Sequence, residues 1–514
     1  MIDISFEING IERDRLETFA VDGFEELSTL FHFDVMCLSP VSQDALGPDC
    51  LGSSATLVMT PAGGPARKIR GIVTDVSVAQ SPLNDQLVYR FRLAPGLSQL
   101  GLSRHNRIYG TLGQINVVDI LQSMLQGTLQ RGSRADDSDR ISIGHDFRLR
   151  GNYPQFDHVT QYEETDLTFL SRLTEHWGIY FFFELHNGDQ HVIFADDPVF
   201  AALLDPAELR FDPTDALAGP GNSNTIQRFE ACYRQVANRI FLQDYNELRP
   251  QVPLLVSAEI DPRGLGYVAE YGDHYRTQEE GNFLARIRAE ELRCVKTRFR
   301  GRSTSPSLAP GYCFDLSGHD VRNWNDRYFT VSVKHYLRRS VFGTAADAIL
   351  AALDACGLQA IDAGAQGYRN EFTAMKLSEN APFRPQRRTP RPRIDGLLSG
   401  RIETSLDNRR PHLDENGRYR VRLPFDLGNA PDGKGSRWVP MAEPYGGPSN
   451  GMHFPLPPGT EVIIACINGD PDRPVIVGAV PSAQTPSVVN AATSHLNRIQ
   501  TRSGITITMA DYTK

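Results

Sequence analysis

Residues 461–478 read EVIIACINGDPDRPVIVG, and they are the most informative stretch of the chain. Two apolar runs flank a segment rich in glycine, aspartate and proline, the residue types that favour tight turns. The pattern predicts a β-hairpin with a short turn. The turn contains Gly469, Asp470, Pro471, Asp472, Arg473 and Pro474. Its charged side chains could form a binding loop, but Asp-Pro turns are common, and we favour a structural role in fixing the hairpin.

The hairpin lies within a strand-rich region that we assign to residues 396–485. Short apolar stretches alternate with turn residues along this region. They cover residues 396–404, 418–423, 437–442, 460–467 and 475–479. Short strands at this spacing are typical of a small closed barrel of the OB type.

Residues 379–395 are predicted to form a linker before this barrel. From Ala381 onward the segment is rich in proline and has no acidic residue before Asp395. Its arginines are Arg384, Arg387, Arg388, Arg391 and Arg393. Repeated proline holds a chain extended, so we expect a semi-rigid strut. Contact with nucleic acid or lipid is disfavoured because no helix or aromatic platform accompanies the arginines, and we expect a solvated linker that docks on a neighbouring subunit.

The N-terminal part of the chain divides into two predicted lobes. The first lobe is assigned to residues 1–150: apolar residues recur at every second position over residues 1–100, as in half-buried strands, and a helix is expected at 117–125. Residues 151–378 are predicted to form a second β-lobe with more helix. Its expected elements are an acid-rich helix at 163–173, a buried strand at 179–183 and a helix at 278–295. The chain is therefore expected to be mainly β with helical inserts, an α+β fold.

Residues 486–514 end in a further alternating stretch. Ile505, Ile507 and Met509 alternate with Thr506 and Thr508. This alternation places the two sets on opposite faces of a strand, and we predict that the apolar set faces inward.

Composition argues against several classes of protein. The net charge of -9 disfavours general nucleic-acid binding, which needs a basic face. The 7 cysteines are scattered and never form a C-x-x-C pair, so neither a disulfide framework nor a zinc site is indicated. The sequence shows neither a signal-peptide pattern nor an apolar run of membrane-spanning length. We expect folding in a reducing cytosol and, if the protein is exported, a route without a cleaved signal peptide.

The sequence offers no pattern that favours catalysis, a cofactor or a metal. His176, His186 and His191 lack the spacing of metal ligands, and we expect them at the surface and in turns. The acid pairs at 163–164 and 279–280 could suggest a glycosidase, but acids at helix starts are explained by the helix dipole. Serine-hydrolase and phosphate-loop motifs do not occur. We therefore predict that the chain is not an enzyme and has no catalytic, cofactor-binding or metal-binding residues.

Several motifs together resemble the VgrG family of type VI secretion spike proteins. In the C-terminal region they lie at residues 438–440, 445–447, 450–455, 458–462 and 469–474, of which the last is the most specific. Earlier motifs lie at residues 27–33, 51–52, 70–73, 161–167 and 178–182. The resemblance implies that the two lobes are similar to the double β-barrel of the phage tail hub, and the barrel at 396–485 to the OB domain of the phage central spike.

The resemblance also implies that residues 486–514 begin a trimeric β-helix needle. Only the first needle strand is present before Lys514, so we expect a truncated or unusually short needle. Ile505, Ile507 and Met509 are then the needle-core candidates. Three chains that wind together would cover each other's unpaired strand edges, which makes a trimer physically reasonable.

The function that the resemblance implies is mechanical. A homotrimer would cap an Hcp-type tube and puncture a target membrane when a sheath contracts, with transient membrane contact and without nucleic acid. A PAAR-type tip protein and effectors or adaptors would bind through the needle. The protein would assemble in the bacterial cytoplasm and then be secreted or injected into a target cell without a cleaved signal peptide.

Two other functions stay open at this stage. A structural hub of a phage tail or another contractile injection machine would share the same motifs, and genomic neighbours would separate it from a secretion spike. A cell-wall hydrolase fused to a spike would need a catalytic domain after the needle, and turnover of peptidoglycan would reveal it.

Overall fold

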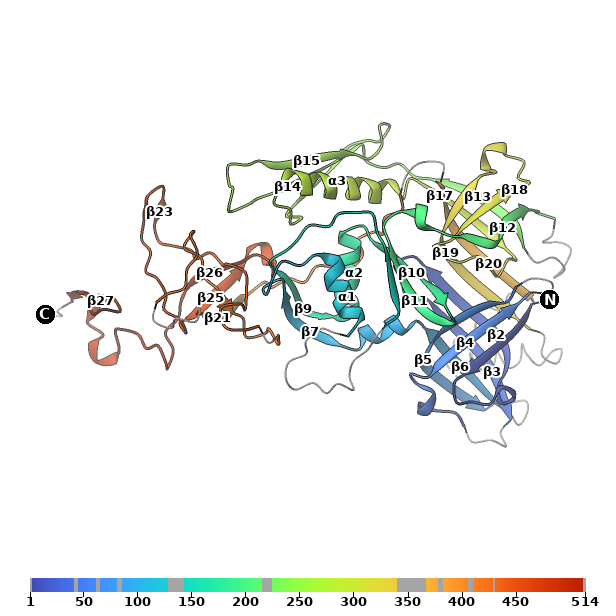
Figure 1. Cartoon of the computed structure of the whole chain (residues 1–514), viewed down its shortest axis with the longest axis horizontal. Helices are drawn as coiled ribbons and strands as arrows, with labels where there is room; N and C mark the ends of the chain where they lie inside the picture. The colour runs from blue at the N-terminus through green and yellow to red at the C-terminus, as the bar shows by residue number, and fades with distance from the viewer. Residues whose placement is uncertain are drawn as a thin grey trace.

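The computed structural model describes residues 2–40, 45–61, 65–80, 86–127, 143–214, 224–339, 367–377, 382–404, 410–428 and 430–511. Figure 1 shows an elongated molecule with β-lobes at one end, a mixed module in the middle, and a small barrel and a tail at the other end. Its α-helices are α1 (Val117–Leu125), α2 (Asp166–His176) and α3 (Gln278–Arg293). The prediction of a mainly β fold with helical inserts is confirmed.

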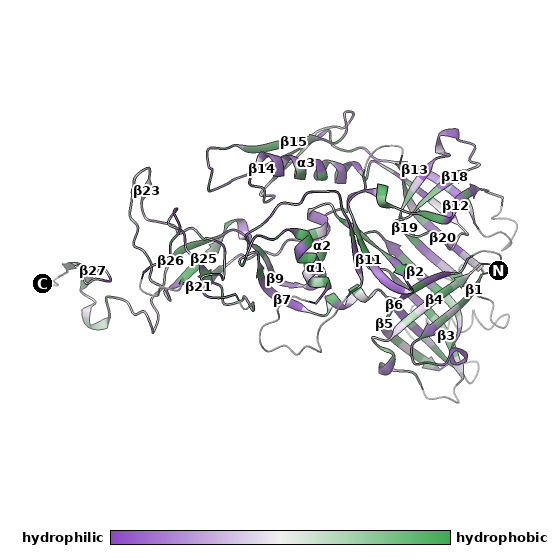
Figure 2. Cartoon of the chain, in the orientation of Figure 1, coloured by the Kyte–Doolittle hydropathy of each residue, from purple (hydrophilic) through white to green (hydrophobic). Residues whose placement is uncertain are grey.

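The N-terminal lobe is an antiparallel sheet in the order β1-β4-β5-β6-β3-β2. Its strands are β1 (Asp3–Ile8), β2 (Glu17–Glu26), β3 (His32–Pro40), β4 (Ser54–Thr60), β5 (Arg67–Gln80) and β6 (Gln86–Ala94). One face of these strands is buried, and the Tyr89 and Phe91 rings stack there with centroids 5.4 Å apart. Figure 2 shows the resulting alternation of apolar and polar residues along the strands.

The second lobe is a closed six-stranded barrel, because β19 pairs with β18 on one side and with β20 on the other. Its strands are β12 (Leu203–Phe211), β13 (Thr225–Tyr233), β17 (Thr297–Ser303), β18 (Cys313–Ser317), β19 (Arg327–Arg338) and β20 (Gly367–Lys376). Its core includes the stacked rings of Phe229 and Phe299. Residues 332–338 of β19 also pair with β2, so both lobes belong to one 12-stranded sheet.

The mixed module lies between the lobes and the C-terminal barrel (Figure 1). Its strands are β7 (Arg104–Tyr109), β8 (His145–Arg148), β9 (Val159–Thr165), β10 (Tyr180–His186), β11 (Asp189–Ala195), β14 (Arg239–Asp244), β15 (Leu254–Glu259) and β16 (Tyr267–Tyr271). Phe169 of α2, Ile240 of β14 and Leu284 of α3 meet in a single core. The predicted helices α1 and α3 are confirmed within two residues of their expected ends.

Helix α2 begins at Asp166, later than expected, because β9 continues to Thr165. The Thr165 hydroxyl accepts a hydrogen bond from Thr168 N at 3.1 Å and caps the helix there. Glu163 and Glu164 therefore lie in a strand, and the helix-dipole explanation is wrong for this pair. The helix-dipole explanation fits the second acid pair, because Glu279 and Glu280 occupy the first turn of α3.

The C-terminal barrel contains a sheet in the order β22-β21-β25-β26. Its strands are β21 (Leu397–Ile402), β22 (Val421–Arg422), β25 (Glu461–Cys466) and β26 (Pro474–Ala479), and a small hairpin joins β23 (Gly446–Gly447) to β24 (Asn450–Gly451). The strand expected at 437–442 is reduced to isolated bridges from Val439 and Met441. Buried apolar residues such as Tyr419 and Ile464 fill the interior.

The tail is a hairpin rather than the single strand expected. Strand β27 (Leu496–Gln500) pairs with β28 (Thr506–Ala510), and Gly504 in the connecting turn has a φ of 88°. The hairpin lies at the end of the molecule opposite the two lobes (Figure 1). Residues 512–514 of the expected needle and 379–381 of the expected linker lie outside the described residues.

Candidate functional site at the domain junction

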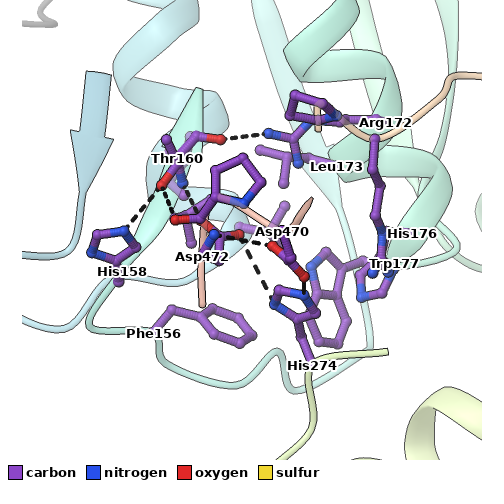
Figure 3. Close-up of a pocket in the computed structure, with 16 residues that line it drawn as sticks. Phe156, His158, Thr160, Arg172, Leu173, His176, Trp177, His274, Asp470 and Asp472 are labelled. Atoms are coloured by element: carbon purple, nitrogen blue, oxygen red, sulfur yellow. Dashed lines mark hydrogen bonds and ion pairs between the residues drawn. The ribbon is translucent and has the colours of Figure 1, made fainter. Parts of the chain in front are cut away.

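Residues 469–474 form a turn, called here the β25–β26 turn, that lies against the mixed module. Arg473 N donates a hydrogen bond to Asp470 O, and Ile467 N donates to Arg473 O, both at 3.0 Å. Asp472 N also donates to Asp470 Oδ1 at 3.0 Å. These bonds hold the turn in shape, and Figure 3 shows Asp470 and Asp472 directed at residues of the module.

Asp470 binds His274, which follows β16. Its Oδ2 hydrogen-bonds the Nε2 of His274, and Asp472 Oδ2 lies 3.9 Å from His274 Nδ1. Burial on its own would raise the pKa of Asp470, but the charge and hydrogen bond of His274 lower it to about 2. The Asp470 carboxylate is therefore ionised at neutral pH.

Asp472 binds the backbone of β9. Its Oδ1 accepts a hydrogen bond from Thr160 N at 2.6 Å. The Thr160 hydroxyl lies 3.5 Å from Pro471 O and 3.0 Å from the Nε2 of His158. Burial lowers the pKa of His158 to about 4, so this imidazole is neutral at pH 7 and serves as a hydrogen-bonding group beneath the turn.

Arg473 completes the contact through an ion pair with Asp244 at the end of β14. Arg473 Nη2 lies 2.5 Å from Asp244 Oδ1. The Asp244 side chain is 0% exposed, and its Oδ2 also accepts a hydrogen bond from His274 N at 2.7 Å. Asp244 thus positions both His274 and Arg473, and it joins the β25–β26 turn to the mixed module.

The cavity beneath the turn is too small for a substrate. Its volume is about 70 Å³, and Phe156, Leu173 and Trp177 supply its apolar lining. Cavities that hold small-molecule ligands measure roughly 300–1,000 Å³. Thr160 and His158 pair a hydroxyl with a base, as nucleophilic sites do, but both are buried beneath the turn. The geometry of the junction therefore indicates that it attaches the C-terminal barrel to the mixed module.

His274, Asp470 and Asp472 could in principle bind a metal ion. Among the described residues, their ligand atoms lie within 4.8 Å of one another. Imidazole and carboxylate are ligands of divalent transition metals. Asp470 Oδ2 already bonds His274 Nε2, so a cation held by these two groups would have to displace that contact.

The linker is bound to the module through residues 384–391, so the expectation of a solvated linker is wrong for this part. Arg384 is buried and lies 2.7 Å from Glu290. It also donates hydrogen bonds to Gly178 O at 2.9 Å and to Asp196 O at 2.8 Å. Both acceptors and Glu290 belong to this chain, which shows that the arginines serve an intramolecular contact.

Further linker contacts follow in order along the segment. Arg387 forms a fork with Glu270, at 2.7 and 2.9 Å. Glu175 of α2 accepts backbone hydrogen bonds from residues 388 and 389, both at 2.9 Å, and a third at 2.9 Å from the Thr389 hydroxyl. Arg391 Nη2 lies 2.8 Å from Asp273. The linker and the β25–β26 turn therefore fasten the C-terminal barrel to the module at two adjacent places.

The His176 side chain is only 13% exposed, which corrects its prediction as a surface histidine. It ends α2, and its Nδ1 lies 2.8 Å from Arg288 Nη2 and 3.8 Å from Asp273. Burial lowers its pKa well below the usual value. His186 and His191 instead lie half-buried on the β10–β11 hairpin, with ring centroids 4.7 Å apart.

Sequence reasoning singled out the turn but missed its partners. Thr160, Asp244 and His274 carry no motif, and their contacts span between 196 and 312 positions of sequence. The needle-core candidates Ile505, Ile507 and Met509 lie on the tail hairpin and are 68%, 59% and 57% exposed in the single chain. Their role in a needle stays a prediction. None of the described helices is long and apolar enough to cross a membrane.

Comparison with known proteins relates the N-terminal and C-terminal parts of the chain to phage-baseplate and type VI secretion families. The family described as phage tail baseplate hub (GPD) matches residues 24–341, which is more than half of the chain. The family described as type VI secretion system/phage-baseplate injector OB domain matches residues 410–480, which include the β25–β26 turn.

Individual proteins give the same result. The type VI secretion system spike protein VgrG5 of Pseudomonas aeruginosa is 30% identical over 485 residues, which are 93% of this chain and 57% of that protein. The actin cross-linking toxin VgrG1 of Vibrio cholerae is 26% identical over 490 residues, which are 92% of this chain and 41% of that protein. The chain thus spans about half the length of these relatives.

A solved structure shares the fold. The E. coli c3393 protein, described as a component of the type VI secretion system with structural similarity to T4 bacteriophage tail proteins gp27 and gp5, aligns with a TM-score of 0.63. The alignment covers 92% of this chain and 99% of that chain at 24% sequence identity. The fold of lobes, module and barrel is therefore shared between the two.

Proposed function

Because the chain belongs to the phage tail baseplate hub family and is a VgrG-type spike protein, we propose that it is a structural component of a type VI secretion spike. In this proposal a homotrimer caps an Hcp-type tube and is driven into a target membrane by contraction of a sheath. The role is mechanical, and the chain assembles in the bacterial cytoplasm before it is secreted or injected without a cleaved signal peptide.

The observation that carries the proposal is the rigid attachment of the C-terminal barrel to the hub end. A spike has to transmit axial force from its base to its tip without bending at the linker. Linker contacts such as the Arg387–Glu270 fork and turn contacts such as Arg473–Asp244 resist that bending together. The Arg473–Asp244 pair is largely buried, which favours a fixed geometry over a mobile one.

The tail hairpin supports the trimer in this proposal. Ile507 and Met509 alternate with threonines along β28, and Ile499 lies directly opposite Ile507 on β27. Directly paired residues project from the same face of a sheet, so the hairpin has one apolar face. Two further copies of the chain would cover this face and the open strand edges.

The tip and cargo functions rest on the family alone. We place a PAAR-type tip protein, effectors or adaptors beyond the tail hairpin, as the resemblance implies. The proposed division of the chain is 1–150 and 151–378 for the lobes, 379–395 for the linker, 396–485 for the OB barrel and 486–514 for the needle start.

Light scattering across a concentration series tests the assembly. The expected mass is three times the chain mass of 57.2 kDa. Co-sedimentation with an Hcp-type tube then tests whether the trimer binds such a tube as its cap. A chain that stays monomeric at every concentration and fails to sediment with tubes would contradict the proposal.

A phage-tail hub is the second candidate, because the matching families cover phage baseplates as well as secretion systems. Binding to a phage tail tube in preference to an Hcp-type tube would favour it. A hydrolase function would instead show as turnover of peptidoglycan by the purified chain.

A further inference from the structure

Strand β17 carries arginines at alternate positions. Its sequence TRFRGRS buries Phe299 in the second barrel and places Arg298, Arg300 and Arg302 on the outer face, as strand alternation requires. Arg302 pairs with Glu371 at 3.2 Å. Arg298 and Arg300 instead line a cavity.

This cavity lies between the outer face of the second barrel and the linker, and its volume is about 410 Å³. Small-molecule sites measure roughly 300–1,000 Å³, so a ligand of several heavy atoms fits. The arginines of the lining are Arg234, Arg298, Arg300, Arg384 and Arg388. This concentration of positive charge contrasts with the net charge of -9 of the whole chain.

The carboxylates of the cavity are already engaged by the linker. Glu26 pairs with Arg388 at 3.2 Å, and Glu175 accepts the linker hydrogen bonds described above. Arg384 is paired with Glu290. The remaining arginines of the lining, at positions 234, 298 and 300, form no ion pair with a carboxylate in the described part of the chain.

Arg298 shows the clearest need for a partner. Its Nη1 atom is buried and has no hydrogen-bond partner among the described residues. Its guanidinium lies 5.8 Å from the ring centroid of Phe383, which does not replace an acceptor. An unpaired buried donor on a charged group destabilises a fold, and an anion in the cavity would supply the missing acceptor.

We propose that this cavity binds an oxyanion with two or more negative charges. Guanidinium groups bind phosphate and carboxylate oxygens through paired N–H donors, and both kinds of anion share this chemistry. Arg298 contacts the anion from the half-buried side of the cavity, and Arg234 and Arg300 contact it from the exposed side.

Calorimetric titration of the full chain with pyrophosphate and, separately, with citrate tests the proposal at constant ionic strength. The cavity variants are Arg298→Met and Arg300→Gln, and Arg302→Gln is the matched control on the same strand face. Each cavity variant is expected to weaken binding about tenfold or more, because charged hydrogen bonds are lost. The control is expected to bind within about twofold of the wild type.

Thermal unfolding separates binding from a purely structural role. Without anion, Arg298→Met is expected to unfold at the same temperature as the wild type or higher, because a buried charge with an unsatisfied donor atom is removed. With pyrophosphate or citrate, the wild type gains thermal stability and the variant does not. Preference for pyrophosphate assigns a phosphate source, and preference for citrate assigns a carboxylate source. Absence of binding, or equal binding by the wild type and both cavity variants, would overturn the proposal.

Discussion

The Arg473 guanidinium lies 2.5 Å from the Asp244 carboxylate, although 229 positions of sequence separate the two residues. The first residue belongs to the β25–β26 turn and the second ends β14, so this pair joins the C-terminal barrel to the mixed module. Both side chains are largely or fully buried, which makes the pair sensitive to the loss of either partner.

Replacement of Arg473 by methionine is expected to destabilise the chain by about 3–5 kcal/mol, because it leaves the Asp244 charge buried and unpaired. Urea unfolding followed by fluorescence measures the change. The double variant Arg473→Met/Asp244→Asn should recover part of the loss, since the unpaired charge is then gone. Arg13→Met removes an exposed pair with Glu7 and serves as the control, with a change within about 0.5 kcal/mol. Equal losses of unfolding free energy in Arg473→Met and Arg13→Met would contradict a buried pair between Arg473 and Asp244.

Stability is expected to fall as the pH drops from about 6.5 to 4, because of His158. Burial lowers the pKa of His158 from 6.5 to about 4 in the folded chain. The unfolded chain therefore takes up a proton in this range before the folded chain does, so the stabilisation is complete above pH 6.5 and is lost as the pH falls. The share of His158 is roughly 3 kcal/mol at 1.36 kcal/mol per unit.

Denaturant midpoints between pH 4 and 8 check this prediction. His158→Gln should flatten the dependence, although the buried His176, whose pKa is also lowered, continues to contribute in the same direction. His495→Gln, on the exposed tail, is the control and should keep the wild-type slope. An unchanged slope in His158→Gln would refute the assignment.

Glu175→Ala is expected to release the linker. The substitution leaves the backbone N–H groups of residues 388 and 389 without their acceptor, at a cost of about 2 kcal/mol. Trypsin should then cleave after Arg387 and Arg388 faster than in the wild type, with mass spectrometry of the fragments as the readout. Glu279→Ala alters an exposed glutamate at the start of α3 and should leave the cleavage rate unchanged. Equal protection of both variants would show that Glu175 does not hold the linker.

Ile507→Asp is expected to weaken the trimer, because a buried carboxylate would replace an apolar side chain in the covered face of the tail hairpin. Light scattering should show dissociation at concentrations where the wild type is trimeric. Thr508→Asp changes the neighbouring residue on the opposite face of β28 and should preserve the trimer. If both variants remain trimeric, the apolar face of the tail does not drive assembly.

Local patterns in the sequence predicted much of the fold. Alternation located the strands of the N-terminal lobe because one face of each strand is buried and the other is not. Helices α1 and α3 were predicted because their apolar residues recur with helical spacing. The start of α2 was missed because acidic residues suit a helix start, whereas the hydroxyl of Thr165 sets the actual cap.

The candidate site was only partly predictable, because its contacts join distant segments. The charged residues of the turn marked it as special, but nothing local to Asp470 identifies His274 as its partner. The arginines of the linker looked solvated because their acidic partners, such as Glu270 and Glu290, lie about a hundred positions upstream on separate elements. Burial of His176 likewise depends on Arg288 and Asp273, which α2 does not contain.

Strand β19 pairs with strands of both lobes, so the sheet of the N-terminal lobe gains its last neighbour late in translation. Glu26 in β2 pairs with Ser332 in β19, so the edge of the first sheet has no partner until the ribosome has made most of the lobes. An unpaired strand edge promotes association between nascent chains, and neighbouring ribosomes on one messenger hold such chains close together. We therefore expect holdase chaperones to shield this strand edge during translation, and the soluble yield of the chain in a cell-free system should rise when they are supplied.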